Sequence, residues 1–272
     1  MTIRILAVIA EAQTVATCLD LAVAAASRIG DAAIEPLHVM VDPRRLDTAA
    51  EEVDFQLMRE VEEGSAQDRA EAVRAAFDAW MARNPAAAPS VVWRKCVGSE
   101  ERRVSQEARD FDLLVLARPH DLDAHDALHA AFFECDKPLL LAPGDWTPPA
   151  SGTFARRIAI AWNGSDPCRR AVTGALPLLR RADVTVILVD GSKREEAELI
   201  ERLADEAITA EIHHFARDDE ELGEQLVTQA HRLSADLLVM GAYRHNQLIE
   251  WLAGGTTRHA IASADVPLLL SH

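Results

Sequence analysis

The sequence lacks the long apolar run that a membrane-spanning helix needs, and its cysteines form no paired motif. No apolar segment approaches the length of about 20 residues that crosses a bilayer. Cys18, Cys96, Cys135 and Cys168 are scattered without a Cys-x-x-Cys pair, so we expect reduced thiols in place of disulfides or a zinc site. The first residues enter an expected strand directly, without the features of a signal peptide. We therefore expect a cytoplasmic protein that makes no use of a membrane.

Basic residues are also in deficit, since the net charge is −16. A phosphate backbone needs basic surface, so nucleic acid is not an expected partner. Residues 1–150 carry 15 Lys and Arg against 26 Asp and Glu, and residues 151–272 carry 13 against 18. A polyanion such as ATP would therefore meet less repulsion in the second half.

Motifs of the common catalytic sites are missing as well. The chain contains no Gly-x-Ser-x-Gly elbow, no Gly-x-x-x-x-Gly-Lys-Ser/Thr loop, no Gly-x-Gly-x-x-Gly fingerprint and no His-Glu-x-x-His pair. We accordingly expect no enzyme, beyond slow hydrolysis of a bound nucleotide.

One histidine pair invites a metal interpretation. His125 and His129 are four residues apart and would share a helix face, close to Asp121, Asp123 and Asp126. No cysteine or glutamate completes a known motif around them. We therefore predict no metal ion beyond the Mg²⁺ that accompanies a nucleotide.

What the chain does contain is the same unit twice. Three segments recur in the same order, with residues 4–10, 112–117 and 136–141 echoed by 157–162, 236–241 and 265–270. Strands that alternate with helices imply parallel sheets with right-handed crossovers. The stretch 143–152 is rich in proline and glycine, as a boundary should be. We predict two α/β domains, 1–145 and 153–272.

Each half should hold five strands. Short apolar runs predict strands near 3–9, 35–41, 91–97, 112–117 and 138–142, and then near 157–162, 184–189, 211–216, 236–241 and 267–271. Between the second and third strands the first half has one long charged helix, expected over 46–82, where the second half has a short one, expected over 193–206. The apolar content of 49% is ample for two cores.

The segment that follows the fourth strand of the second half looks like a ligand site. Gly241 frees the backbone where that strand ends, and Gly254 and Gly255 precede Thr256 and Thr257, where a helix over 256–263 should begin. A helix N-terminus favours an anion, so a phosphate is an attractive ligand. The structural alternative is a tight turn with a threonine N-cap.

This segment resembles the universal stress protein family. Its ATP-binding members carry Gly, two residues, Gly, nine residues, Gly and then Ser or Thr after the fourth strand. Gly241 and Gly254 match the first and third glycines, while Arg244 stands at the second. Gly255 occupies the Ser/Thr position, with Thr256 one place further on. The departures fall on the residues that would contact phosphate.

The repeated unit resembles the same family along nearly the whole chain. The resemblance implies two tandem five-stranded, parallel, doubly wound Rossmann-like domains with strand order 3-2-1-4-5. In such proteins two fused domains imitate the dimer of single-domain members, and their terminal strands pair or pack together. Ligands of these sheets bind at the carboxyl ends of the strands where the order reverses. The sequence leaves open whether the tandem chain pairs further into a homodimer.

The resemblance also assigns roles in the second half. Asn163 stands where the family usually has an aspartate near the adenosine, and Val189 ends the strand that lies beside adenine. Arg244 either presents its guanidinium to the phosphates or fills the pocket. The residues expected to bind an adenine nucleotide, ATP in the first place, are Trp162, Asn163, Gly164, Val189, Gly241, Arg244, His245, Gly254, Gly255, Thr256 and Thr257.

The corresponding loop of the first half has the wrong chemistry for phosphate. Residues 118–126 contain no glycine and include three carboxylates. The first strand ends at Ala10, Glu11 and Ala12, without an Asp or Asn at the position of Asn163. We predict a degenerate site that does not hold ATP in the manner of the family.

Two functions of different classes follow from these observations. The first is a stress-response regulator that binds an adenine nucleotide in its C-terminal domain and thereby alters its binding to a protein partner. The alternative is a nucleotide-independent scaffold or interaction protein of the same fold with a vestigial pocket. A metal-dependent hydrolase built on the 120–129 cluster is a third interpretation.

Overall fold

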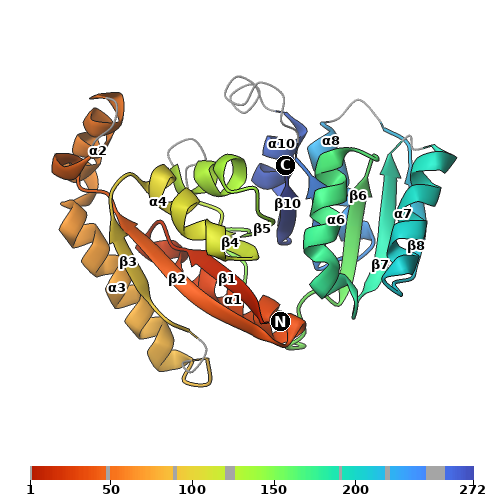
Figure 1. Cartoon of the computed structure of the whole chain (residues 1–272), viewed down its shortest axis with the longest axis horizontal. Coiled ribbons are helices and arrows are strands. Elements are labelled where there is room, and N and C mark those ends of the chain that lie inside the picture. Colours follow the sequence, from red (N-terminus) through yellow and green to blue (C-terminus); the bar gives the residue numbers. More distant parts are fainter. Residues whose placement is uncertain are drawn as a thin grey trace. The chain divides into compact units, whose positions relative to one another are not determined.

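The computed structural model describes residues 2–46, 50–87, 91–119, 126–189, 192–217, 221–242 and 255–272. The chain divides into two compact units, Met1–Lys137 and Pro138–His272. Each unit consists of helices packed against a mainly parallel sheet (Figure 1). The predicted α/β class is therefore confirmed.

The first unit alternates strands and helices, as the sequence predicts. Its sheet has the order β3-β2-β1-β4, with all neighbours parallel. In chain order its main elements are β1 (Ile3–Val8), α1 (Val15–Ile29), β2 (Ala32–Met40), α2 (Ala50–Glu63), α3 (Ala66–Arg83), β3 (Arg94–Val97), α4 (Glu100–Glu107), β4 (Leu113–Ala117) and α5 (Asp126–His129).

The second unit repeats this plan and contains the complete predicted order. Its five parallel strands lie in the order β8-β7-β6-β9-β10, which is 3-2-1-4-5 for that half. Its elements are β5 (Leu139–Ala142), β6 (Arg157–Trp162), α6 (Asp166–Leu179), β7 (Asp183–Val189), α7 (Lys193–Asp205), β8 (Ala210–Phe215), α8 (Leu222–Arg232), β9 (Leu237–Gly241), α10 (Thr256–Ser263) and β10 (Leu268–Ser271).

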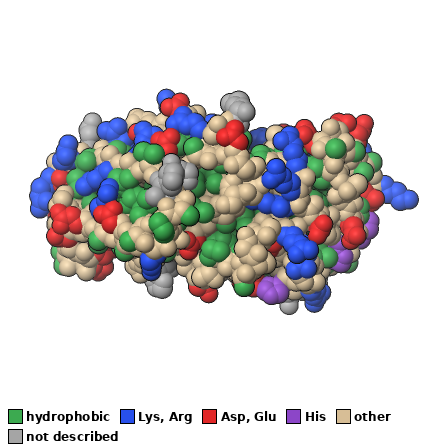
Figure 2. Space-filling view, turned by 90° about the horizontal axis from the view of Figure 1, so that it is seen from below, with side chains coloured by type: hydrophobic (Ala, Val, Ile, Leu, Met, Phe, Trp, Pro, Cys, Tyr) green, Lys and Arg blue, Asp and Glu red, His purple; other side chains and the backbone are tan. Residues whose placement is uncertain are grey.

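The fourth strand of each repeat, β4 or β9, is apolar and is shielded from water on both faces of its sheet. Every residue of β4 and of β9 is buried, which is the environment that a continuous Leu and Val run predicts for a central parallel strand. Among the described residues most charged side chains lie outside these cores, and Glu100 is a buried exception. On the face shown in Figure 2, acidic and basic side chains are interspersed with apolar and neutral ones.

The aspartate before each fourth strand explains one of the sequence repeats. Asp112 Oδ2 accepts a hydrogen bond of 2.8 Å from the backbone N–H of Arg4. In the second unit, the Asp236 carboxylate accepts bonds of 3.0 and 3.1 Å from the backbone N–H groups of Arg156 and Arg157. Each carboxylate thus ties the start of the fourth strand to the start of the neighbouring first strand.

Strand β5 forms where a strand was expected near 138–142, and it shows the pairing of terminal strands that the resemblance implies. Residues 139–141 pair antiparallel with residues 268–270 of β10. The stretch 143–152 consequently lies inside the second unit. The division at residue 137 reflects the pairing of β5 with β10 and does not locate the point where the two sequence repeats join. The domain bounds 1–145 and 153–272 therefore stay a prediction.

The long helix expected over 46–82 is wrong, because α2 and α3 are separate helices. Ser65 is the N-cap of α3, and its hydroxyl oxygen accepts a hydrogen bond of 3.2 Å from the backbone N–H of Asp68. The Asp68 carboxylate accepts one of 3.0 Å from the backbone N–H of Ser65. This reciprocal capping box satisfies backbone amide groups at the start of α3, so α3 begins as a separate helix and does not continue α2.

Strand β3 is also shorter than the expected 91–97. It begins at Arg94, and Val91 forms only an isolated bridge with Ile34. Of the helices formed by the described residues, none combines the length and the apolar character that crossing a membrane requires.

Replacing Ser65 by alanine should lower the free energy of unfolding by about 0.5–2 kcal/mol, because the N-cap acceptor of α3 is lost. The measurement is urea denaturation followed by circular dichroism. Ser99→Ala is the matched control, since Ser99 is the N-cap of α4 but its side chain makes no capping hydrogen bond. Equal losses for the two variants would contradict the role given to the Ser65 capping box.

Candidate functional site

A cavity lies at the carboxyl ends of the central strands of the second unit. Strands β6 and β9 are parallel neighbours. After β6 the chain continues to β7 on one side of this pair, and after β9 it continues to β10 on the other. The loops that follow the two strands therefore diverge, which opens a crevice at this point of the sheet. The cavity has a volume of about 220 Å³. Its lining consists of Ala161, Trp162, Asn163, Cys168, Val189, Arg217, Leu222, Leu226, Met240, Gly241 and Thr256.

Five of the residues predicted from the sequence are brought together here. Trp162, Asn163, Val189, Gly241 and Thr256 all line the cavity. Three more are sequence neighbours of lining residues. Gly164 lies in the turn before α6, and Gly255 and Thr257 lie at the start of α10. Three further residues predicted to bind the ligand lie outside the described residues, namely Arg244, His245 and Gly254.

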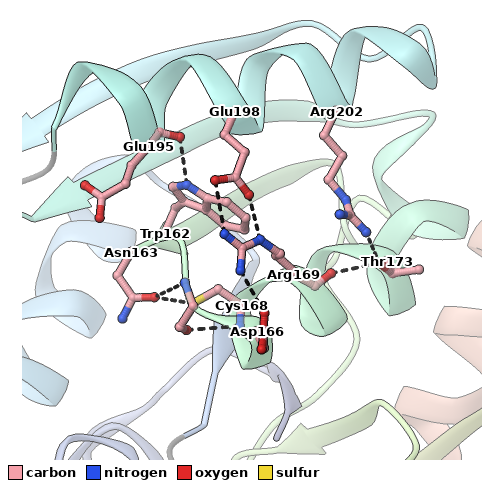
Figure 3. A network of polar contacts seen from close by, with 10 residues as sticks. Trp162, Asn163, Asp166, Cys168, Arg169, Thr173, Glu195, Glu198 and Arg202 are labelled. Carbon is pink, nitrogen blue, oxygen red and sulfur yellow. Dashed lines mark hydrogen bonds and ion pairs between the residues drawn. The ribbon is translucent and has the colours of Figure 1, made fainter.

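The indole of Trp162 forms a fixed wall of the cavity. Its exposed fraction is 2%. Its Nε1–H donates a hydrogen bond of 2.9 Å to the carbonyl oxygen of Glu195 in the first turn of α7 (Figure 3). Because a buried indole N–H needs a partner, this bond holds β6 and α7 in one relative position. The residue therefore has a structural role that does not depend on a ligand.

Asn163 organises the turn that leads into α6. Its Oδ1 accepts hydrogen bonds from the backbone N–H of Ser165 at 3.1 Å and from Cys168 Sγ at 3.0 Å (Figure 3). Ser165 is the N-cap of α6, and its hydroxyl oxygen accepts from the Cys168 backbone N–H. An aspartate would accept the same bond from Ser165, so asparagine keeps the turn and removes one negative charge from the cavity rim.

Gly241 is required by the packing of α6. A Cβ atom on Gly241 would lie 2.4 Å from the backbone N of Cys168 and 2.7 Å from the carbonyl carbon of Pro167. The first turn of α6 therefore rests directly on the end of β9. The sequence pattern predicts that Gly241 lets a ligand approach the backbone, and the structure adds a packing role that is sufficient to require glycine.

The start of α10 forms another edge of the cavity. Its N-cap is Gly255, which has no side chain to cap the helix, and Thr256 is its first residue. The helix expected over 256–263 is therefore confirmed, whereas the threonine N-cap of the structural alternative does not form, because Thr256 already lies inside the helix. The helix is held by α8, where a Cβ on Gly223 would lie only 2.1 Å from the Thr256 carbonyl oxygen. Amide groups at a helix start without a side-chain cap are suited to an anion.

Sequence reasoning missed two polar residues of the lining. Arg217 follows β8, is exposed, and makes no hydrogen bond or ion pair with another described residue. Arg217 could have been predicted from its position just after the third strand of a parallel sheet, because the residues that follow such strands lie at the ligand-binding edge. Cys168 is buried in the first turn of α6, and no motif marks it.

A network of ion pairs joins α6 to α7 beside the cavity (Figure 3). Arg169 contacts Glu198 at 2.6 Å and Asp166 at 2.8 Å. The hydrogen bond with Arg169 lowers the pKa of Glu198. Exposed pairs of this kind contribute little individually, so their main effect is to fix the two helices relative to each other.

The proposed metal cluster of the first unit falls largely outside the described residues, which exclude 120–125. Of its members, the side chain of His129 is described, and its Nδ1 lies 3.7 Å from Glu101 Oε1. Within the part of the chain that the structure describes, no group of three His, Cys, Asp or Glu side chains is arranged to hold a metal ion.

Comparisons with known proteins agree with this architecture. Residues 190–272 match the model of the universal stress protein family. A universal stress protein from Archaeoglobus fulgidus DSM 4304 has a TM-score of 0.61 at 14% identity, over 98% of this chain and 95% of that one. A protein of Pseudomonas aeruginosa UCBPP-PA14 assigned to the same family has a TM-score of 0.54 at 15% identity, over 98% and 92%. A search of curated protein sequences gave no match.

The fold and the cavity at its strand ends define a tandem α/β protein of the doubly wound class. Its C-terminal segment, residues 190–272, matches the model of the universal stress protein family, and the whole chain shares the fold of the two full-length structures named above.

Substituting Gly241 by alanine should destabilise the protein by about 1–3 kcal/mol, the usual cost of adding a methyl group where none fits. Chemical denaturation measures the effect. Ala117 ends β4 in the first unit and corresponds to Gly241, so Ala117→Gly is the comparison, with an expected loss of about 0.5–1 kcal/mol from added chain freedom. A Gly241→Ala variant as stable as the parent would show that α6 does not rest on β9.

The start of α7 should respond to acid. The backbone N–H of Ser192, and then its hydroxyl, donate to the Glu195 carboxylate and lower the pKa of Glu195 below the ordinary 4.5. A lowered pKa in the folded state contributes stability above the unfolded pKa, and this contribution is lost as the pH falls through the folded value. An NMR titration of the Glu195 carboxyl carbon should show the lowered pKa, and Ser192→Ala should raise it. An unchanged pKa in that variant would contradict the contribution of the hydroxyl and would leave the backbone N–H as the cause.

Proposed function

We propose that the second unit binds an adenine nucleotide, ATP in the first place, and that the protein is a cytoplasmic stress-response regulator whose binding to a protein partner depends on this ligand. The observation that supports the proposal most is the cavity between the ends of β6 and β9, which five independently predicted residues line. Family resemblance supplies the identity of the ligand.

The lining suits a purine base more than a phosphate chain. Val189, Leu222, Leu226 and Met240 supply apolar surface. The volume of about 220 Å³ is below the roughly 300–1,000 Å³ of ordinary ligand pockets, so the described part would hold the base alone. The phosphates would extend toward the start of α10, where the helix N-terminus favours negative charge.

Arg217 is the side chain on this rim that is best suited to a phosphate. Its guanidinium would donate charge-assisted hydrogen bonds to phosphate oxygens. The lining contains no His, Asp or Glu among the described residues. We therefore propose binding without catalysis, and Mg²⁺ only as the companion of the nucleotide.

The small cavity also favours the second candidate function. A nucleotide-independent interaction protein would keep the packing roles of Trp162, Asn163 and Gly241 and would need no space for a ligand. The two functions differ in one measurable respect, which is whether a nucleotide stabilises the folded chain.

The melting temperature of the metal-free protein should rise with millimolar ATP plus Mg²⁺ and respond less to AMP or inorganic phosphate. A ligand that binds only the folded state stabilises it by about 2.7 kcal/mol at a hundredfold excess over its Kd. A well-folded protein whose melting temperature ignores all three ligands would support the interaction protein.

Arg217→Ala should weaken ATP binding by about tenfold, the loss expected for one charge-assisted contact, and leave AMP binding nearly unchanged. Arg232→Ala is the matched control, because Arg232 is an exposed arginine at the end of α8 that does not line the cavity. Isothermal titration calorimetry measures both. Equal affinities of the two variants for ATP would remove Arg217 from the site. Arg244→Gly completes the set, since it weakens ATP binding if Arg244 grips phosphate and strengthens it if Arg244 blocks the pocket.

A further inference from the structure

The first unit contains a larger cavity, of about 510 Å³, at the carboxyl ends of β1 and β2. This volume lies within the range of ordinary small-molecule pockets. Side chains from β2, from α2 and α3 and from the start of α4 line it together with the residues that follow β1. The proposed function of the second unit makes no use of this cavity.

A buried histidine borders the cavity. His38 is 4% exposed, and its Nδ1 lies 2.9 Å from the carbonyl oxygen of Ile9. A carbonyl only accepts, so Nδ1 carries the proton, and Nε2 of the neutral ring is an acceptor. Burial lowers the pKa of His38, which keeps the ring neutral. The Nε2 atom makes no hydrogen bond with any described residue, so it can accept one from a ligand.

A carboxylate oxygen in the same lining also lacks a partner. Glu11 Oε1 is buried without a hydrogen bond among the described residues, while Oε2 accepts a bond of 3.3 Å from Gln13. A buried carboxylate oxygen without a donor is costly. The charge of Arg59, whose pKa Glu11 helps to raise, offsets part of this cost, and Oε1 keeps the capacity to accept a hydrogen bond from a ligand.

The charges around the cavity favour a cation. The carboxylates of Glu11, Glu63, Asp68 and Glu100 line it, against the guanidinium groups of Arg59 and Arg69. Both arginines have partners of their own, and so do two of the carboxylates, Glu63 and Asp68. Arg59 forms an ion pair of 2.8 Å with Glu63, and Arg69 donates to the Gly64 carbonyl and to Gln56. A triphosphate would be repelled here, whereas an ammonium group would be attracted.

The remaining lining is apolar. Val39, Met40, Val41 and Val73 contribute to it. A ligand that fills the cavity therefore needs a hydrocarbon body as well as a donor group, because apolar contact supplies much of the affinity of small ligands.

We propose that the cavity of the first unit binds a small organic cation with a hydrocarbon body, whose ammonium group donates hydrogen bonds to Glu11 and, directly or through water, to His38. The first unit is thus a ligand site of opposite charge preference to the one proposed for the second.

The test uses the full chain with phenethylamine and putrescine as probes, and with phenethyl alcohol and butanediol as their neutral counterparts, in isothermal titration calorimetry. The amines should bind at least about tenfold more tightly than the alcohols, because a charge-assisted hydrogen bond is stronger than a neutral one. Alcohols that bind as tightly as the amines would overturn the proposal, and so would a folded protein that binds neither amine.

Two variants locate the site without disturbing the core. Glu11→Gln keeps the shape of the side chain and should weaken amine binding by about tenfold to a hundredfold. Ala72 is exposed on α3 and lines the cavity, so Ala72→Phe should block it. Glu62→Gln is the matched control, since Glu62 is exposed on α2 and does not line the cavity. Unchanged amine affinity in both Glu11→Gln and Ala72→Phe would overturn the proposal.

Repeating the amine titration in the presence of ATP distinguishes this proposal from the one made for the second unit. Excess ATP should leave the affinity for phenethylamine unchanged, whether or not ATP itself binds. Displacement of the amine by ATP would assign one shared nucleotide site to both ligands and would overturn the proposal of a cation site.

Discussion

The parallel pairing of β6 with β9 is the constraint on which the second unit depends. Residues 158–161 lie beside 237–240, and the chain leaves the two strands in opposite directions. At one end of this pair Asp236 fixes the strands through backbone N–H groups, and at the other Gly241 lets α6 close on the end of β9. A cavity between the loops follows from that packing, whatever ligand uses it.

The two units show how one topology carries different chemistry. In the second unit the turn after the first strand contains Asn163, whose oxygen is committed to the N-cap region of α6. In the first unit Glu11 follows the corresponding strand, and one of its oxygens is buried without a donor. The backbone therefore sets where a ligand can lie, while a few side chains at the strand ends set its charge.

Much of the fold could be predicted because its signals are local. The apolar runs and the aspartates at 112 and 236 repeat in order, and buried parallel strands need such runs. The break before Ser65 was missed although its capping residues are present, because the charged helical pattern continues across it. Arg217 and the contact that requires glycine at 241 depend on residues far apart in the sequence, so no local pattern shows them.

The antiparallel pairing of β5 with β10 has a consequence for how the chain tolerates cleavage. Without β5, the backbone N–H and C=O groups along residues 268–270 would form an open sheet edge, flanked by leucines that are now buried. Open apolar edges recruit strands from other molecules. A protease that cut within 143–152 would leave β5 joined to the residues that precede it but no longer to those that follow, so separation of the two fragments would uncover this apolar edge.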